Sequence, residues 1–328
     1  MKTLCLSIVL VLGIVSSALA QTWQHPFASN SPWNTHIGPG AKFVPANLQP
    51  ASWMSIDEEI FVVTKASDPL RTVYKPQAWD HRCGGHDEQG LELHLPETFI
   101  VSDATPGHTP NNPGAFLLPD GQTIVQVNPV ARCDSFGPMY GWQAPTVTLD
   151  GQGIQGGHGG SGLSSIGGSL RRGELTSSSP IKHALKVNIW GKKYLWKFSD
   201  GDVGYRWPAW RHDGDAPDSY GGTNPSLRLG SLLAIPRSVA DTLHLETAPG
   251  RKICDVLCSY GAYVVDDTAW DAYALCVEAG VREEFRTANH AAIEAQSGPW
   301  YRDMMKLYGA LSVVDNNGPN SIGGGPTP

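Results

Sequence analysis

Residues 151–190 read GQGIQGGHGGSGLSSIGGSLRRGELTSSSPIKHALKVNIW, and the fold class follows from this stretch. The last seven residues alternate between apolar and polar side chains, which is the period of a β-strand. We expect Leu185, Val187 and Ile189 to face the core, and Lys186, Asn188 and Trp190 to face solvent. Gly191-Lys192 looks like a turn into KYLWKF, so residues 184–198 predict a hairpin.

Ten of the first 23 residues of this stretch, 151–173, are glycine, which indicates tight turns or close backbone approaches that a side chain would forbid. The segment contains His158 and lies between two strand-like sequences, so it does not read as a linker. Such a loop is either a candidate active site or a set of turns and bulges in a β-sheet protein. We favour neither on glycine content alone.

The rest of the chain predicts a mainly β protein. Further strands are expected at 60–64, 123–127 and 262–266, and 37 glycines and 25 prolines are spread widely. Helical spacing appears only late, at 251–260, where Gly261 would end the helix, and at 300–312. We therefore predict one domain of β-sandwich or jelly-roll-like architecture over residues 21–315, with a few helices in its C-terminal third. Residues 316–328 are expected to be an irregular tail.

The first twenty residues have the pattern of a secretory signal peptide. Lys2 precedes an apolar run, and Ala18-Leu19-Ala20 resembles a cleavage site. No later segment contains 18 consecutive apolar residues, so we predict a secreted protein without a membrane partner. The formal net charge of −7 argues against nucleic acid as a partner.

Five of the six cysteines follow the signal segment, and export makes disulfides plausible. Cys254 and Cys258 share a predicted helical turn, which makes them poor partners for each other. We favour a Cys83–Cys133 bond, with Cys276 reaching one of that pair.

Residues 171–211 differ in charge from the rest of the chain, because they carry nine Lys or Arg against three acids. The same stretch is rich in Trp, Tyr and Phe. Flat rings stack on pyranose faces and cations neutralise acidic groups, so this pattern favours binding of an anionic polysaccharide. The predicted binding residues are Arg172, Arg211, Trp190, Lys192, Trp207 and Trp210.

The leading hypothesis is a polysaccharide lyase that cleaves a uronate-containing glycan by β-elimination. This chemistry requires a group that neutralises the uronate carboxylate, a base for the C5 proton and an acid for the leaving oxygen. Arginines suit the first role, imidazoles the second and phenols the third. The candidates are Arg171, Arg172 or Arg211 for neutralisation, His158 or His183 as the base, and Tyr205 or Tyr220 as the acid.

Two other functions remain open. A glycoside hydrolase would need two carboxylates, for which Glu174 with Asp213 or Asp215 are the candidates. A glycan-binding or extracellular-matrix protein without catalytic activity would use the same rings and cations. Asp213-Gly-Asp215-Ala-Pro-Asp218 could hold Ca²⁺ or form ordinary turns, and we predict no other metal or cofactor. The match of residues 151–156 to G-x-G-x-x-G lacks the following helix of a dinucleotide site.

Three motifs carry a resemblance. They are NNPGAFLLPDG with NPVARC (111–133), GGHGGSGLSSIGG with RRGEL and IKHALKVN (156–188), and YGAYVVDDTAWD (260–271). Together they resemble a family of secreted, mostly bacterial proteins, which implies export and one shared fold but no particular activity. A looser similarity to β-sandwich polysaccharide lyases rests on architecture and charge.

Overall fold

A computed structural model describes residues 21–325 of the chain. The predicted signal peptide and the last three residues of the predicted tail lie outside this range. The fold is mainly β, with 31% of residues in strands against 16% in helices, and it is consistent with the predicted β-sandwich-like single domain. Among the described residues, the only helices longer than four residues are α4 (Ala248–Ser259), α5 (Val281–Asn289) and α6 (Gly298–Ala310), all in the C-terminal third as predicted.

Twelve strands form one mixed sheet in the order β1-β13-β10-β11-β9-β12-β2-β5-β6-β7-β3-β4. Their bounds are β1 Phe43–Pro45, β2 Trp53–Val63, β3 Leu70–Tyr74, β4 Glu88–His94, β5 Gly114–Leu117, β6 Thr123–Ala131, β7 Met139–Thr148, β9 Leu185–Trp190, β10 Leu232–Ala234, β11 Ala262–Thr268, β12 Ala272–Glu278 and β13 Ser312–Val314. A further strand, β8 (Gln155–His158), contacts β6 and β7.

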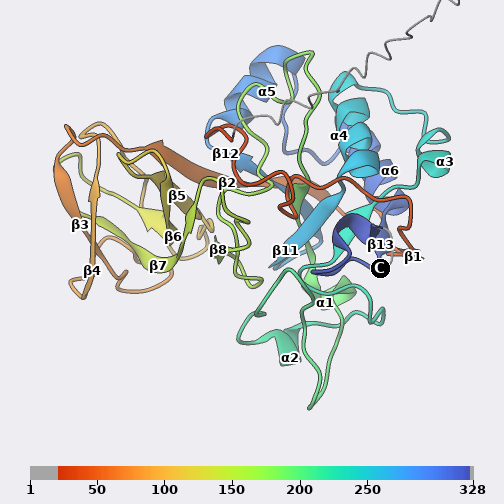
Figure 1. The fold of residues 1–328 in the computed structure, drawn as a ribbon, viewed down its shortest axis with the longest axis horizontal. Coiled ribbons are helices and arrows are strands. Elements are labelled where there is room, and N and C mark those ends of the chain that lie inside the picture. Colours follow the sequence, from red (N-terminus) through yellow and green to blue (C-terminus); the bar gives the residue numbers. More distant parts are fainter. Residues whose placement is uncertain (1–20, 326–328) are drawn as a thin grey trace, which may run out of the picture.

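The long strand β2 joins the two halves of the sheet. Its first part, Trp53–Glu59, pairs in parallel with β12, and its last part, Ile60–Val63, pairs in parallel with β5. Figure 1 shows the resulting division, with β3 to β7 on one side and the helices gathered around the other. There are two buried apolar clusters: the smaller one lies among β3 to β7, and the larger one lies between the helices and strands β9 to β13 and extends to residues of β2, β5 and β6.

Strand β9 confirms the strand predicted from ALKVNIW but not its exposure. It lies inside the sheet, parallel to β11 and antiparallel to β12, and all its residues except Trp190 are buried. Lys186 and Asn188 therefore point into the protein, and the prediction that they face solvent is wrong. The predicted hairpin over 184–198 is also wrong, because α1 (Gly191–Tyr194) follows β9 and both sides of β9 are already paired.

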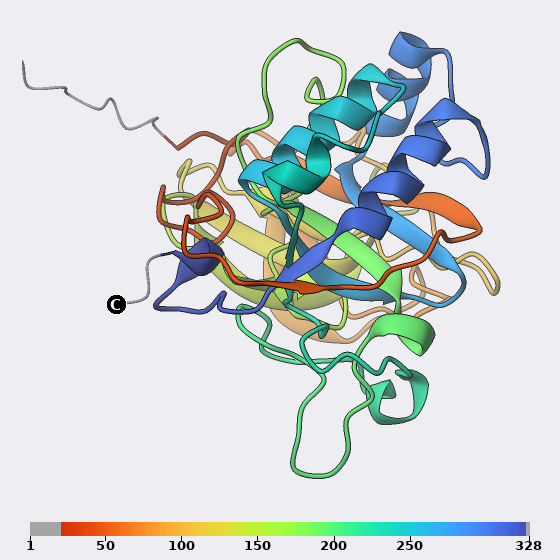
Figure 2. The same ribbon diagram turned by 90° about the vertical axis from the view of Figure 1, so that its right-hand side faces the viewer.

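The two predicted helices are confirmed as α4 and α6. The Thr247 hydroxyl caps α4 by accepting a hydrogen bond from the Gly250 amide, and Gly261 follows the helix with φ of 76°. Figure 2 shows α4, α5 and α6 together on one face, with the long loops around α1 and α2 (Ala216–Ser219) on the opposite side. The third short helix is α3 (Arg237–Ala240). No helix within residues 21–325 has the length and apolar character needed to cross a membrane.

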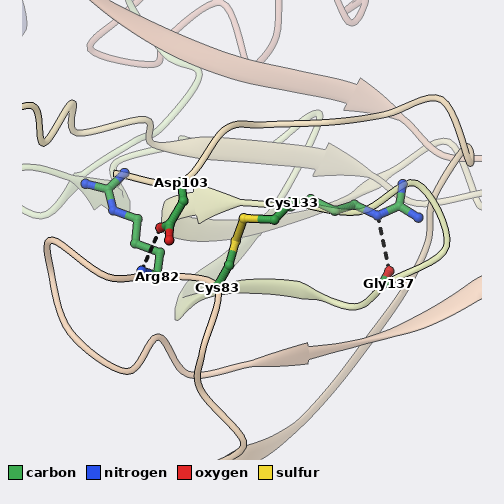
Figure 3. Close-up of a disulfide and its surroundings, with 6 residues drawn as sticks. Arg82, Cys83, Asp103, Cys133 and Gly137 are labelled. Atoms are coloured by element: carbon green, nitrogen blue, oxygen red, sulfur yellow. Dashed lines mark hydrogen bonds between the residues drawn. A yellow bond between two sulfur atoms is a disulfide. The ribbon is translucent and has the colours of Figure 1, made fainter. Parts of the chain in front are cut away.

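The predicted Cys83–Cys133 disulfide is present, and it joins the loop before β4 to the end of β6 (Figure 3). Cys254 and Cys258 are free thiols, in keeping with their shared helical turn. Cys276 is also free and lies buried in β12, so the prediction that it reaches the disulfide pair is wrong. The predicted tail contains one short 3-10 helix, η1 (Ile322–Gly324), and the Gly38 amide donates to the Gly323 carbonyl.

Candidate active site

The glycine-rich segment wraps around buried carboxylates at the end of β11. The Gly160 amide donates to Oδ1 of Asp266 at 2.9 Å. A Cβ atom on Gly159 would lie 2.1 Å from the Asp266 carboxyl carbon, and one on Gly160 would lie 2.2 Å from Oδ2 of Asp213. The glycines are therefore required here because the backbone passes within contact distance of two acidic side chains.

Three carboxylates converge at this place, and we call Asp213, Asp266 and Asp267 the carboxylate group. One oxygen of each lies within 4.8 Å of the others. Asp266 and Asp267 are consecutive in β11, whereas Asp213 comes from the loop before α2. The Tyr220 hydroxyl donates to Oδ2 of Asp213 at 2.6 Å. Asp213 and Asp267 keep part of their surface exposed, and Asp266 is buried.

Burial and mutual repulsion separate the pKa values of this group from those of ordinary aspartates. Burial is the largest cause for each of the three and disfavours the charged form. The neighbouring Asp213 adds to it, so the pKa of Asp266 lies well above its usual range and that of Asp267 rises to about 6. The pKa of Asp213 is also raised, but its hydrogen bond from Tyr220 opposes the shift.

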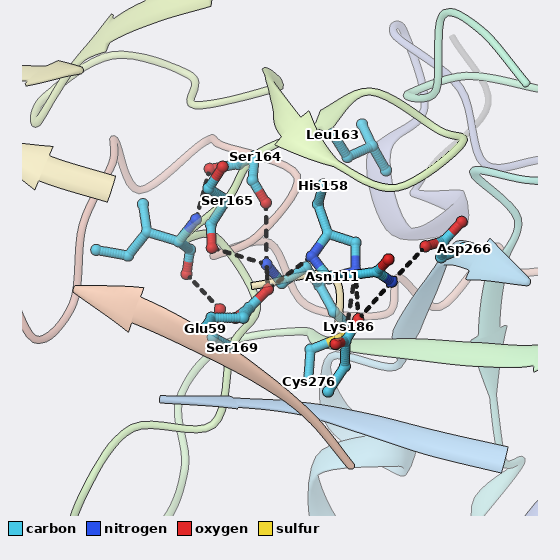
Figure 4. Close-up of polar contacts among 12 residues, drawn as sticks. Glu59, Asn111, His158, Leu163, Ser164, Ser165, Ser169, Lys186, Asp266 and Cys276 are labelled. Atoms are coloured by element: carbon cyan, nitrogen blue, oxygen red, sulfur yellow. Dashed lines mark hydrogen bonds and ion pairs between the residues drawn. The ribbon is translucent and has the colours of Figure 1, made fainter. Parts of the chain in front are cut away.

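A second polar cluster lies deeper, and we call Asp57, Glu59, His158, Lys186 and Cys276 the buried cluster. Nε2 of His158 lies 3.6 Å from Oδ2 of Asp57 and 3.5 Å from Sγ of Cys276. On the other side of the ring, Oε1 of Glu59 lies 2.7 Å from Nδ1, at ion-pair distance but at an angle outside that of a hydrogen bond. Nζ of Lys186 lies 2.5 Å from the same Glu59 oxygen. Figure 4 shows Glu59, Lys186 and Cys276 around the His158 imidazole.

One amide connects the two clusters. Nδ2 of Asn111 lies 3.0 Å from Oδ2 of Asp57 and 2.9 Å from Oδ2 of Asp266, and it donates to both. Burial is the main cause that raises the pKa of Asp57, and it likewise raises the pKa of the Cys276 thiol well above its usual range. The two clusters thus form one continuous polar region between strands β2, β8, β9, β11 and β12.

Three of the predicted site residues lie beside the carboxylate group. Tyr220 contacts it directly. Nη2 of Arg211 donates to the Gly159 carbonyl at 2.9 Å, and its charge opposes the upward shift of the Asp213 pKa. Trp210 is 40% exposed, and its Nε1 donates to the Gly162 carbonyl at 2.6 Å. Two carbonyls of the glycine-rich segment therefore hold Arg211 and Trp210 by hydrogen bonds.

His158 does not lie at a surface. Its side chain is 0% exposed inside the buried cluster, because β8 directs it between β2 and β12. A base that removes a proton from a polymer must be within hydrogen-bond reach of that polymer. The expectation that His158 forms the catalytic edge of a basic surface is therefore wrong.

His183 and Arg171 belong to a separate polar group. Nε2 of His183 lies 3.0 Å from Oε1 of Glu174, and Nε of Arg171 donates to Oε2 of Glu278 at 3.0 Å. Burial alone would lower the pKa of His183, but the Glu174 carboxylate outweighs it and raises that pKa. Arg171 is 2% exposed and lies over the Trp23 ring. Since the Arg171 guanidinium already pairs with Glu278, Arg171 is not free to neutralise a substrate carboxylate.

The other predicted residues are scattered over the surface of residues 172–211. Arg172 and Lys192 are exposed, and Tyr205, Trp207 and Trp190 are half-buried. Tyr205 packs on His212, with 5.9 Å between ring centroids. Lys192 belongs to α1. The stretch does not form one continuous basic surface, because its two buried cations, Arg171 and Lys186, point into the protein.

Sequence reasoning missed most of the buried cluster, although β2 carried a signal. In SIDEEIF, Asp57 and Glu59 occupy alternate positions of a strand and so share one face. Two acids on one face of a strand that is otherwise apolar predict a buried polar site when that strand is central. Asp266 ends AYVVD and Asp267 follows it. A cap at the end of the strand explains this pair as simply as a functional site does.

Three sets of side chains in the described part of the chain have the composition of metal ligands, but in one of them, Cys83, Asp103 and Cys133, the two sulfurs are joined in the disulfide, which leaves two. One is the carboxylate group, and the other is Asp57 with His158 and Cys276. A hard cation such as Ca²⁺ would suit the first, but its members are Asp213, Asp266 and Asp267 rather than the predicted loop 213–218. Nitrogen and sulfur donors in the second suit a transition metal.

Comparison of this chain with protein-family models, curated proteins and solved structures finds no match.

Proposed function

We propose that this protein is a secreted enzyme that cleaves glycosidic bonds by acid–base chemistry at the carboxylate group. The observation that supports this proposal is the meeting of Asp213, Asp266 and Asp267 within 4.8 Å in environments that hold their pKa values apart. Carboxyl groups with different environments can serve as an acid and a base at the same pH. Strongly perturbed carboxyls are also concentrated at functional sites.

Each carboxyl has a distinct role in this proposal. Asp267, half-buried and with a pKa of about 6, donates a proton to the leaving oxygen. Asp213 is the partner carboxylate that attacks or stabilises the sugar, and the Tyr220 hydroxyl and Arg211 favour its ionised form. Asp266 is a positioning residue, because it is buried and held by the Gly160 amide and the Asn111 side chain.

The spacing and surroundings favour hydrolysis with retention of configuration. Retaining glycosidases hold their two carboxyl groups about 5–5.5 Å apart, whereas inverting enzymes need about 6.5–9.5 Å to admit a water. One oxygen of each member of the carboxylate group lies within 4.8 Å of the others, which is closer to the first arrangement. Trp210 offers a ring whose position is fixed by its bond to the Gly162 carbonyl, and such a ring suits stacking on a sugar.

Electrostatics favours a neutral glycan over the acidic one expected from the sequence. The carboxylate group itself consists of three acids. Of the predicted neutralising arginines, only Arg211 contacts the glycine-rich segment beside it. A polyuronate would meet repulsion there. β-Elimination nevertheless remains the second candidate, because the exposed Arg211 places a cation beside Asp213, but Tyr220 is 1% exposed and so does not reach a polymer as the acid.

The test is incubation of the mature protein with a panel of neutral and uronate-containing polysaccharides. New reducing ends without a double bond indicate hydrolysis, and ultraviolet absorbance of an unsaturated uronate indicates elimination. We expect Asp267→Asn and Asp213→Asn each to lower kcat at least about 100-fold, the lower end of what an acid–base group contributes.

Two matched variants serve as controls. Asp218→Asn removes an exposed acid from the neighbouring helix α2, and Glu174→Gln removes the carboxylate of the separate His183 group. Both should keep activity within a few-fold of wild type. Glycan binding without turnover over the whole panel, or full activity in Asp267→Asn, would refute the proposal.

A further inference from the structure

Asp57, His158 and Cys276 come from three different strands and converge in the interior. Asp57 belongs to β2, His158 ends β8, and Cys276 lies in β12. Nε2 of His158 lies 3.6 Å from the Asp57 oxygen and 3.5 Å from the Cys276 sulfur, and the third distance is no more than 4.8 Å. Three different donor types, oxygen, nitrogen and sulfur, thus point at one spot.

The two separations from Nε2 of His158 match the edges of a tetrahedral zinc site. Zinc binds sulfur at about 2.3 Å and nitrogen or carboxylate oxygen at about 2.0–2.2 Å, so two ligands of a tetrahedron lie about 3.4–3.6 Å apart. A direct hydrogen bond between carboxylate and imidazole would instead bring the atoms to about 2.7–2.9 Å. The observed 3.6 Å between Asp57 and His158 is too long for that bond and fits a cation between them.

The surroundings of the imidazole have the form expected around a metal ligand. Glu59 lies against Nδ1, which orients the ring and leaves Nε2 to face Asp57 and Cys276. Metal-bound histidines usually have a carboxylate or carbonyl at their other nitrogen, and Glu59 occupies that place here at ion-pair distance. Asn188 donates to Asp57 at 3.2 Å, and its Oδ1 lies 3.6 Å from the Cys276 sulfur, beside the fourth position.

A thiol–imidazole nucleophile is the competing interpretation of Cys276 and His158. It fails on access, because these side chains are 1% and 0% exposed.

We propose that Asp57, His158 and Cys276 bind one zinc ion, which ties β2, β8 and β12 together beneath the carboxylate group. The ion is structural, because its ligands are closed off from solvent. It fixes the end of β8, from which the glycine-rich segment continues toward Asp213 and Asp266. The proposal does not depend on the glycan-cleaving function, and it can hold if that function fails.

The test uses the untagged mature protein with Cys254→Ser and Cys258→Ser, which removes the two other free thiols of residues 21–325. Elemental analysis after extensive dialysis should find about one zinc per chain. After removal of zinc with a chelator, Co²⁺ should bind with the visible absorption of a tetrahedral site and a sulfur-to-cobalt charge-transfer band. Zinc should restore the melting temperature that the chelator lowers.

Cys276→Ser should lose the charge-transfer band, and Asp57→Asn should bind Co²⁺ at least tenfold more weakly while keeping the band. Asp218→Asn is the matched control for the second variant and should change neither result. Absence of zinc together with no uptake of Zn²⁺ or Co²⁺ by the chelated protein overturns the proposal, whether or not the variants fold. A Co²⁺ spectrum that lacks the sulfur band also overturns it, because the metal would then lie elsewhere.

Discussion

Replacing Asp267 by Asn should stabilise the protein in a strongly pH-dependent way. In the native protein the Asp267 carboxyl takes up its proton at a pH of about 6, because burial and the nearby Asp213 disfavour its charge, whereas its ordinary pKa is 3.8. The native state therefore binds more protons than the unfolded chain between these two values. The wild-type free energy of unfolding falls as pH rises through this window.

The size of the effect follows from the two pKa values. The interval between 3.8 and about 6 corresponds to about 3 kcal/mol, since each pKa unit is worth about 1.4 kcal/mol. Asn cannot ionise, so the variant escapes this loss. The free energy of unfolding of Asp267→Asn minus that of wild type should therefore increase by up to about 3 kcal/mol between about pH 4 and about pH 8.

Urea denaturation followed by circular dichroism at several pH values measures this difference. The exposed Asp218→Asn serves as the control, and its difference from wild type should stay flat over the same range. The pH-dependent part isolates the carboxyl from any constant effect of the new amide. A difference that does not change with pH, or one that decreases toward pH 8, would show that Asp267 is not held in a charge-disfavouring site.

Three further outcomes are expected. Gly160→Ala places a Cβ 2.2 Å from Oδ2 of Asp213, and it should abolish turnover in the reducing-end assay while a circular dichroism spectrum stays native-like. Lys186→Met leaves the fully buried Glu59 without its cation and should lower the free energy of unfolding by about 3–5 kcal/mol in urea titrations; a loss below about 1 kcal/mol would contradict that pairing. Reduction of the disulfide, which spans 50 residues of sequence, should cost about 4 kcal/mol in the same titrations under reducing conditions, and an unchanged midpoint would rule out its contribution.

Local patterns in the sequence determined the fold class and some of the elements. Alternation predicted β9 within ALKVNIW, and helical spacing with a glycine stop predicted α4. The Cys83–Cys133 bond was also predicted. These predictions succeeded because each depends on neighbours in the chain or on a choice among few partners.

Which face of a strand is buried was decided only by the tertiary structure. Lys186 follows an apolar residue and looks solvent-facing in the sequence, yet β9 has strands on both sides and protein on both faces. The lysine is stabilised there by Glu59, which lies 127 residues earlier in the chain. No local pattern encodes a pairing of that range.

The carboxylate group follows the same rule. The sequence alone predicted tight turns or close backbone approaches in the glycine-rich segment, and the structure contains such an approach at Gly159 and Gly160. What the backbone approaches, Asp213 and Asp266, could not be read from the chain, because these residues lie 53 or more positions beyond Gly160. Composition and periodicity indicate which conformation a short segment of the chain prefers. A site, in contrast, is assembled by contacts between distant segments, and only the packed sheet brings those segments together.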